Sequence, residues 1–294
     1  TSMETHSGLN MPGSTVGSIY SLTALGASHG YTCAVLDNNE MKCWGKAENG
    51  SLGNGDDSQN QYTPVGVNEL NSNTCCFSDI EETSPDGDHS CALSDGSVYC
   101  WGLDTAGQIG HGHLSCVGNG YCVNPHGPSV LNRNIVTFTT GLRHTCAIAD
   151  DSTAWCWGEN DFGQLGVGDN DDRNAPTQVL LPAGTTPISI NAGGHTTCVI
   201  LDNGTGLCWG KSDYGHLGDG TYNNRNEPTP ISILPSNRSL VAMDLGAGHA
   251  CGILDDGTAH CWGNGTFSSG ESGGRLGDGS NESSRFPRSV SLPS

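Results

Sequence analysis

The segment Cys91-Ala-Leu-Ser-Asp-Gly-Ser-Val-Tyr-Cys100-Trp101-Gly102 decides the fold, because related versions of it occur five times in the 294 residues. In the other four repeats, the two cysteines and the Trp-Gly pair span residues 33–45, 146–158, 198–210 and 251–263. Successive Trp-Gly pairs lie 57, 56, 52 and 53 residues apart. A repeat of about this length is typical of one four-stranded blade of a β-propeller.

A second signature follows each Trp-Gly pair. It is a Leu-Gly or Ile-Gly pair, beginning at Leu52, Ile109, Leu165, Leu217 and Leu276, and then a proline near a β-branched residue, at Pro64, Pro128, Pro176, Pro228 and Pro287. Glycine is abundant, at 44 residues, and this favours short strands and tight turns over helices. In the fourth repeat we expect strands near residues 187–190, 196–201, 205–209 and 228–234.

We therefore predict an all-β protein, a β-propeller of five four-stranded blades. An N-terminal extension over residues 1–20 precedes one domain over residues 21–292, whose repeats cover about 21–70, 71–133, 134–183, 184–235 and 236–292. The chain ends with a last proline-containing strand around Phe286 to Val290. We expect this C-terminal strand to complete the first blade and close the ring, because closure removes exposed sheet edges.

Turn length predicts which cysteines pair. Asp95-Gly96 is a two-residue hairpin turn, and counting outward from it places Cys91 opposite Cys100 at a non-hydrogen-bonded position. The Cα atoms there approach to about 4.5 Å, which suits a disulfide. A three-residue turn absorbs the extra residue of the other repeats. The predicted bonds are Cys33–Cys43, Cys91–Cys100, Cys146–Cys156, Cys198–Cys208 and Cys251–Cys261.

Four of the 14 cysteines lie outside the repeat. Cys116 and Cys122 flank a Gly-Asn-Gly turn and are predicted to pair by the same counting. Cys75 and Cys76 are adjacent, and either a vicinal bond or a bond to another molecule would satisfy them. Because no Cys-x-x-Cys knuckle occurs, the sequence predicts disulfides rather than zinc, and no metal site. Such a set of disulfides indicates an extracellular location, either secreted or at the cell surface.

The repeat resembles that of the regulator of chromosome condensation family. The similar residues are His144-Thr-Cys-Ala-Ile148, Cys156-Trp157-Gly158 and Gly163-Gln-Leu-Gly166, and the resemblance spans roughly residues 22 to 292. It implies a β-propeller, usually of seven blades, so five repeats are a departure. It also implies protein binding on a rigid ring, and the cysteine-bearing repeat is similar to that of secreted and cell-surface members. The nucleotide-exchange activity of the founding member is not expected here, because the chain has no basic face.

Composition excludes several classes of function. Only 11 Lys and Arg stand against 31 Asp and Glu, a net charge of −20, so we expect no nucleic-acid partner and no docking on anionic membranes. No apolar run approaches the roughly 18 residues of a membrane-spanning helix, so no membrane insertion is expected. The N-terminal sequence fits a mature, processed polypeptide.

No catalytic residues are identified, because no Ser-His-Asp or Cys-His-Asn arrangement can be defended, and the chain is predicted not to be an enzyme. Histidines recur before the first cysteine of each pair, and repetition favours a structural role in bonding neighbouring blades: His29, His89, His144, His195 and His249. Trp155 lies outside the repeat and is expected to be an exposed aromatic residue.

We predict no cofactor, and two metal alternatives are less favoured. His111 and His113 form a histidine pair, and Asp169, Asp171 and Asp172 lie in a loop that could hold calcium. Five Asn-x-Ser/Thr sequons are candidates for N-glycosylation: Asn49, Asn203, Asn237, Asn264 and Asn281.

Insertions distinguish the repeats from one another, at residues 71–84, 113–126 and 265–273. The last two extend the connection between the third and fourth strands, so both are expected on one face, where a partner would bind. The sequence thus predicts an extracellular, non-catalytic protein-interaction or structural module, which includes a self-assembling subunit of a surface appendage or matrix. The alternatives are a carbohydrate-binding, lectin-like propeller with glycan ligands, and a protein inhibitor that covers an enzyme with one ring face.

Overall fold

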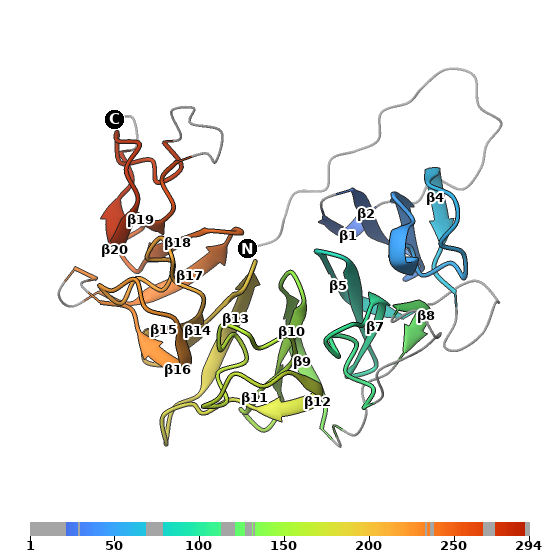
Figure 1. Ribbon diagram of the computed structural model, residues 1–294, viewed down its shortest axis with the longest axis horizontal. Helices are drawn as coiled ribbons and strands as arrows, with labels where there is room; N and C mark the ends of the chain where they lie inside the picture. Colours follow the sequence, from blue (N-terminus) through green and yellow to red (C-terminus); the bar gives the residue numbers. More distant parts are fainter. Residues whose placement is uncertain are drawn as a thin grey trace.

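The computed structural model describes residues 22–28, 30–68, 79–112, 121–126, 131, 133–232, 234–235, 238–266 and 274–291. These residues form five antiparallel sheets of four strands each, here called blades 1 to 5 in chain order (Figure 1). The predicted all-β propeller of five four-stranded blades is thereby confirmed. Within the described residues no helix has the length and apolar character needed to cross a membrane.

Every blade contains four consecutive strands. Blade 1 contains β1 (Leu22–Ala27), β2 (Tyr31–Leu36), β3 (Met41–Gly45) and β4 (Gln61–Gly66), with the 3-10 turn η1 (Glu48–Gly50) after β3. Blade 2 contains β5 (Ile80–Asp86), β6 (His89–Ser94), β7 (Ser97–Leu103) and β8 (Tyr121–His126). Blade 3 contains β9 (Ile135–Thr140), β10 (His144–Ala149), β11 (Ala154–Gly158) and β12 (Arg173–Gln178). Blade 4 contains β13 (Pro187–Gly193), β14 (Thr196–Leu201), β15 (Gly206–Gly210) and β16 (Arg225–Pro230), and blade 5 contains β17 (Leu240–Leu245), β18 (His249–Leu254), β19 (Ala259–Gly263) and β20 (Ser284–Ser289).

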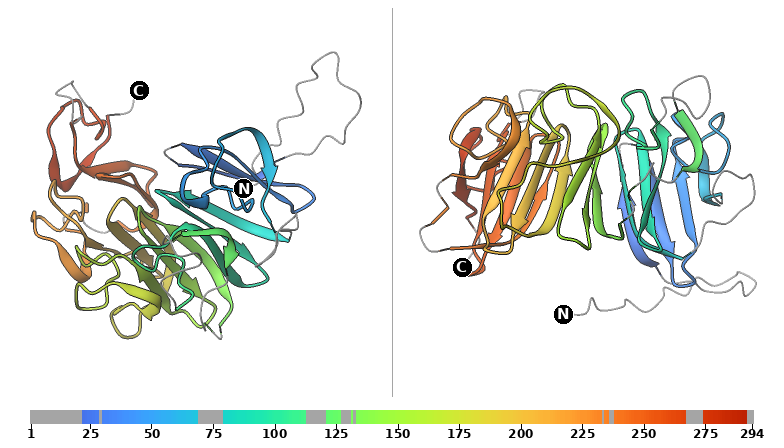
Figure 2. Two further views of the ribbon diagram at one scale, coloured as in Figure 1. Left: turned by 45° about the vertical axis from the view of Figure 1, so that its right-hand side comes forward. Right: turned by 90° about the horizontal axis from the view of Figure 1, so that it is seen from below.

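The blades follow one another around an open arc rather than a closed ring (Figure 1). The first strand of each blade contacts the first strand of the next, from β1 through β5, β9 and β13 to β17. Blades 1 and 5 lie at the two ends of the arc, and the sheets stand side by side along it (Figure 2). Contacts of the same kind recur at the four interfaces, and the five blades leave the circle incomplete (Figure 1).

The prediction that the C-terminal strand closes the ring is wrong. Strand β20 pairs with β19 of its own blade, through Cys261 with Arg288 and Gly263 with Ser284. Blade 1 already has a fourth strand of its own, β4, which pairs with β3 through Cys43 and Val65. The reason is local: the connection after Trp-Gly brings the proline-containing strand back to the edge of its own third strand, so each repeat is a complete sheet.

Blade 2 differs from the predicted pattern in its fourth strand. The register pairs Gly102 with Cys122, as it pairs Gly158 with Arg173 in blade 3. This alignment makes Pro125 of β8, rather than Pro128, the counterpart of Pro176. Residues 121–126, predicted as part of an insertion, are therefore a blade strand, and so are residues 80–84 in β5.

A tryptophan from each of blades 2 to 5 joins it to the blade before. The Trp101 indole Nε1 donates to the carbonyl of Ser51 at 2.9 Å, and Trp157, Trp209 and Trp262 donate to the carbonyls of Gln108, Gln164 and His216 at 2.8 to 3.0 Å. These four side chains are fully buried, at 0% exposure. Burying four indoles, each with its polar atom satisfied, makes the blade interfaces the main core of the molecule.

The apolar faces at the ends of the arc lack a neighbouring blade. In β1 the Leu25 side chain is 62% exposed, whereas Phe138, in the corresponding place on β9, is 3% exposed because it packs against blade 2. At the other end, Ile253 of blade 5 is 46% exposed, while Ile200 of blade 4 is buried against blade 5. Each end therefore presents half of a blade interface.

Candidate functional site

The long connections between third and fourth strands gather at one end of the blades, here called the loop face. Backbone hydrogen bonds fix them beside the turns between first and second strands: Lys46 N donates to Gly30 O, Glu159 N to Arg143 O, and Lys211 N to His195 O, at 2.8 to 2.9 Å. The connections from β7 to β8 and from β19 to β20 start on this face. Parts of the predicted insertions 113–126, 265–273 and 71–84 lie outside the described residues, namely residues 113–120, 267–273 and 71–78.

A cavity of about 800 Å³ opens at the centre of the arc. It is lined by the ends of the first strands and the turns that follow them, including Ser28, Thr140, His195 and Asp244. The backbone frame is alike from blade to blade, but these side chains differ. The cavity is thus a place where individual recognition can be built on a repeated frame.

An ion-paired group borders this cavity on blades 3 and 4. The Nδ1 atom of His195 lies 2.7 Å from a carboxylate oxygen of Glu159, and the Arg143 guanidinium lies 3.8 Å from the other oxygen. Gln164 Nε2 also donates to Glu159, at 3.1 Å. The hydrogen bond from His195 holds the pKa of the Glu159 carboxyl below its usual range. Glu159 therefore stays an anion, and it holds the side chains of His195, Arg143 and Gln164 in place.

Aromatic and cationic side chains surround this carboxylate. The Phe162 ring meets the His195 ring edge-on at 5.0 Å between centroids, and Lys211 Nζ lies 4.7 Å above the Phe162 ring. Tyr214, on the next connection, is 48% exposed. We call these side chains together the blade 3/4 rim: Arg143, Glu159, Phe162, His195, Lys211 and Tyr214.

The five histidines predicted to be equivalent are not. In the register, His89, His144 and His249 share one position, opposite Gly102, Gly158 and Gly263. Gly210, however, pairs with Thr196, and Gly45 pairs with Tyr31. His195 is therefore one residue out of step, and a one-residue shift turns a strand side chain to the other face. This shift places His195 on the rim, a site that counting back from Cys198 could have shown. His29 lies outside the described residues.

His89 and His144 have the predicted structural role. His89 Nε2 lies 2.9 Å from Oγ1 of Thr145, and His144 Nε2 lies 2.8 Å from Oγ1 of Thr197, each in the next blade. Because both threonine hydroxyls donate to a carbonyl, each histidine must donate from Nε2. Burial lowers the pKa of both imidazoles to about 3, so they are neutral links between blades.

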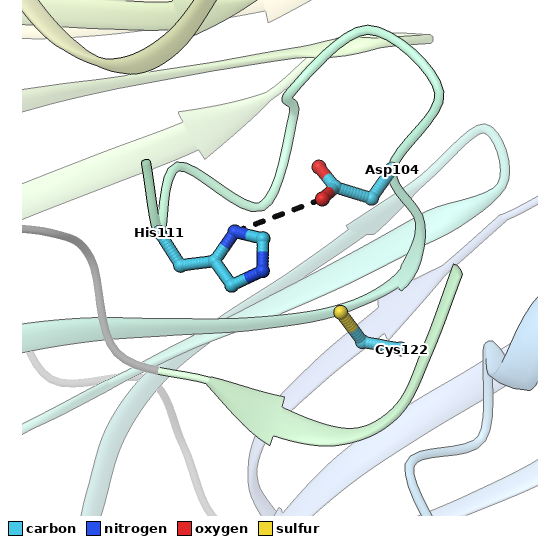
Figure 3. Close-up of side chains that lie close together, drawn as sticks. All are labelled: Asp104, His111 and Cys122. Carbon is cyan, nitrogen blue, oxygen red and sulfur yellow. Dashed lines mark ion pairs between the residues drawn. The ribbon is translucent and has the colours of Figure 1, made fainter. Parts of the chain in front are cut away.

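A second cluster lies in blade 2. A carboxylate oxygen of Asp104 is 3.7 Å from Nδ1 of His111, and Cys122 Sγ points into the same space from β8 (Figure 3). One ligand atom from each of the three side chains lies within 4.8 Å of the other two. Asp104 is buried, its Oδ2 has no hydrogen-bond partner, and burial raises its pKa to about 6. Cys122 is in a disulfide, and its predicted partner Cys116 lies outside the described residues, as does His113.

The other predicted residues have local roles or lie apart. The structure joins Cys33–Cys43, Cys91–Cys100, Cys146–Cys156, Cys198–Cys208 and Cys251–Cys261, the pairs that turn length predicts, while Cys75 and Cys76 fall outside the described residues. Trp155 is half-buried rather than exposed, because Arg133 lies 4.8 Å over its ring.

The structure also shows the positions of the candidate calcium loop and of the predicted N-glycosylation sites. Asp169 is paired with Arg173 at 2.6 Å, and Asp172 accepts from the backbone of Asn160, so the loop carboxylates serve the loop itself. Of the sequons, Asn203 and Asn281 are exposed and Asn49 and Asn264 are half-buried. Asn237 is outside the described residues.

The five sheets share one fold, whereas the side chains of the loop face differ from blade to blade. These features define the chain as a repeat β-propeller. Residues 95–148, 151–200 and 203–253 match the model of the regulator of chromosome condensation (RCC1) repeat, and a second model of this repeat matches residues 135–164 and 240–269. Together these stretches make up more than half of the chain. The chain belongs to the RCC1 repeat family, whose propellers are generally non-catalytic binding or regulatory modules.

Individual relatives are similar to the chain at low sequence identity. The chain is 27% identical over 266 residues to the mouse E3 ubiquitin-protein ligase HERC2, covering 90% of this chain and 5% of the relative. It is 30% identical over 219 residues to the ultraviolet-B receptor UVR8 of Arabidopsis thaliana, covering 72% and 46%. Prp20p of Saccharomyces cerevisiae, described with its binding properties to Gsp1p and histones, superposes with a TM-score of 0.76 at 22% identity, over 93% of this chain and 64% of Prp20p. The chain spans less than half the length of either curated relative.

Proposed function

We propose that this chain is an extracellular, non-catalytic module that binds a protein partner through the blade 3/4 rim. The observation that carries the proposal is the combination, beside the cavity-lining His195, of an exposed tyrosine, a phenylalanine with Lys211 over its ring, and a fixed carboxylate. Tyrosine and arginine dominate the binding energy of protein interfaces because they combine large contact area with a polar group.

The partner should carry positive charge. The chain has a net charge of −20, and the connections around the rim hold the exposed acids Asp161, Asp171, Asp172 and Asp213. Such a field accelerates the approach of a basic partner and weakens as salt is added. Prp20p, a relative in fold, is described with histones and Gsp1p as binding partners, which supports a protein as the ligand class.

The extracellular location is proposed from the cysteines. Five disulfides are distributed one per blade, all inside hairpins and nearly all buried. Disulfides of this number form and persist in oxidising compartments. The rim and the disulfides are independent observations, so the binding function does not depend on the location.

The test is affinity capture from the secreted fraction of the native source with the immobilised chain. The double variant Phe162→Ala/Tyr214→Ala removes both rim aromatics. We expect the wild type to retain a basic protein at low salt, and the double variant to lose at least about 1–2 kcal/mol of binding, measured by titration with the captured protein.

Tyr62→Ala is the matched control, because Tyr62 is 93% exposed on β4, away from the rim. It should bind like the wild type. If the double variant captures the same proteins with the same affinity as Tyr62→Ala, the rim is not the binding site.

A further inference from the structure

We propose that Asp104, His111 and Cys122 form a binding site for a borderline divalent metal ion such as Zn²⁺, which the disulfide of Cys122 keeps closed. A carboxylate, an imidazole and a thiolate are the ligand types of zinc sites that keep one coordination position open. When the disulfide is reduced, the thiolate supplies the third ligand.

The three ligand atoms already converge. Each lies within 4.8 Å of the other two, and the Asp104 carboxylate faces the His111 ring at 3.7 Å. The three residues come from two segments, the connection after β7 and the start of β8 (Figure 3). Ligands around a tetrahedral ion at distances of about 2.0–2.3 Å stand roughly 3.3–3.8 Å apart, so closing on an ion needs movements of about an ångström or less.

One buried carboxylate oxygen of this cluster, Oδ2 of Asp104, supports a metal ion as the ligand. Asp104 is 1% exposed, and its Oδ1 accepts from the backbone of Ile109 at 3.0 Å, but its Oδ2 has no hydrogen-bond partner. At the corresponding place in blade 3, Asn160 accepts from Leu165 in the same way and donates from Nδ2 to the carbonyl of Asp169. The turn therefore needs only the first oxygen of Asp104, and the second is left for another group.

The same positions in blade 4 hold an ion pair. Asp219 and Arg225 correspond to His111 and Cys122 by their distance from Trp-Gly and by the register opposite Gly210, and they pair at 2.8 Å. Blade 2 replaces this pair with two metal-ligating residue types next to an unsatisfied carboxylate. A metal site requires ligand residues at all three positions in the same blade, as in blade 2. The fold of the blade does not require them, because blades 3 and 4 have other residues there.

The switching step is a thiol–disulfide exchange. Two equivalents of a thiol reductant, R–SH, transfer two electrons to the disulfide of Cys122, which yields two cysteine thiols and one R–S–S–R. On metal binding the Cys122 thiol loses its proton to solvent, and the ion keeps its oxidation state. Nine of the ten hairpin cysteines are buried, Cys251 is half-buried, and the hairpin disulfides are not part of this step.

The experiment uses Co²⁺ as a spectroscopic substitute for Zn²⁺. Cys116→Ser, prepared without reductant, should free Cys122 and leave the hairpin disulfides intact, and mass spectrometry after alkylation checks that Cys122 is a thiol. We expect this variant to bind one Co²⁺ with a thiolate-to-cobalt charge-transfer band, at least about tenfold more tightly than the oxidised wild type. No band, or equal affinity in the oxidised wild type, overturns the proposal.

If alkylation shows that Cys122 is still bonded, the comparison is made between reduced wild type and reduced Cys122→Ser, in which all other cysteines are matched. The wild type should bind one more Co²⁺ per chain, and equal binding overturns the proposal.

Three single variants test the ligands, and each has a precedent in another blade. Asp104→Asn copies Asn160, His111→Asn copies Asn54, and Cys122→Ser copies Ser284. The first two, made in the Cys116→Ser background, should each weaken Co²⁺ binding at least about tenfold while the circular dichroism spectrum is unchanged. Asp172→Asn, in an exposed acidic loop, should have no effect, and a similar loss there would mean that general acidity binds the ion.

Discussion

The Nε2 atom of His144 lies 2.8 Å from Oγ1 of Thr197 in the next blade, and that hydroxyl donates in turn to the carbonyl of Gln164. The carbonyl also accepts from the Trp209 indole. One buried relay thus ties β10 of blade 3 to β14 of blade 4 and to the loop face. His89, Thr145 and Gln108 repeat it between blades 2 and 3.

Breaking the relay should destabilise the arc. Thr197→Val keeps the side-chain shape but leaves the His144 N–H buried without an acceptor, which should cost about 1–3 kcal/mol of unfolding free energy. Urea denaturation measures the change. Thr229→Val, on the outer strand β16, loses only a local bond to the Glu227 carbonyl and should cost well under this amount. Equal effects of the two substitutions would contradict the role given to the relay.

The buried histidines should make the fold acid-sensitive. Burial lowers the pKa of His89 and His144 to about 3, from about 6.5 in the unfolded chain. Because the unfolded state binds more protons between these values, their contribution is complete above about pH 6.5 and is lost as the pH falls towards 3. Each histidine adds a slope of up to about 1.4 kcal/mol per pH unit in this window.

Thermal melts of the wild type and of His89→Gln/His144→Gln from about pH 7.5 to about pH 4 check the acid sensitivity. The glutamines can still donate to the threonines but do not titrate, so the stability of the double variant should vary less with pH. An unchanged slope would show that other groups cause the acid sensitivity.

The ends of the arc should tolerate substitutions that the inner interfaces do not. Phe138→Ala empties a buried site between blades 2 and 3 and should cost about 3–5 kcal/mol. Leu25→Ala, on the uncovered face of β1, should change stability by less than about 0.5 kcal/mol in the isolated chain. Chemical denaturation of the two variants gives the comparison. A large loss for Leu25→Ala would mean that this face is covered in solution.

Each hairpin disulfide should contribute measurably to stability. Cys198 and Cys208 close a loop of about ten residues, for which the chain-entropy model gives roughly 2.5–3 kcal/mol. Cys198→Ala/Cys208→Ala should lower the unfolding free energy by about this amount. Intact mass after alkylation of unfolded, unreduced protein from its native source is the complementary measurement, and substantial labelling would contradict both the disulfides and the extracellular proposal.

Local features were predictable because short-range geometry determines them. Turn length alone places Cys91 opposite Cys100, since antiparallel pairing leaves no other partner once the turn is chosen. Counting residues back from the first cysteine of each pair separates His195, three residues before Cys198, from His144, two residues before Cys146. In blade 2 the sequence pattern fits both Pro125 and Pro128, and only the pairing of Gly102 with Cys122 shows that Pro125 is the proline of the fourth strand.

The candidate sites depend on neighbours that the sequence does not place. The rim joins Glu159 to His195 across two blades, and 36 residues of chain separate them. Asp104 and Cys122 lie 18 residues apart, on either side of a connection whose path no turn rule fixes. Charge and composition argue against nucleic acid as a partner, but they do not predict the blade 3/4 rim or the cluster of Asp104, His111 and Cys122.

The sequence by itself determined the number of blades, the four-strand plan of each and the hairpin pairs, because each of these follows from spacing within one repeat. Only the tertiary structure decided that the arc stays open, which side chains meet between blades, and which carboxylates lie beside a histidine. The physical reason is that the rotation from one blade to the next is set by side-chain packing at the interfaces, such as Trp209 on the Gln164 carbonyl, and packing is not a property of any single repeat.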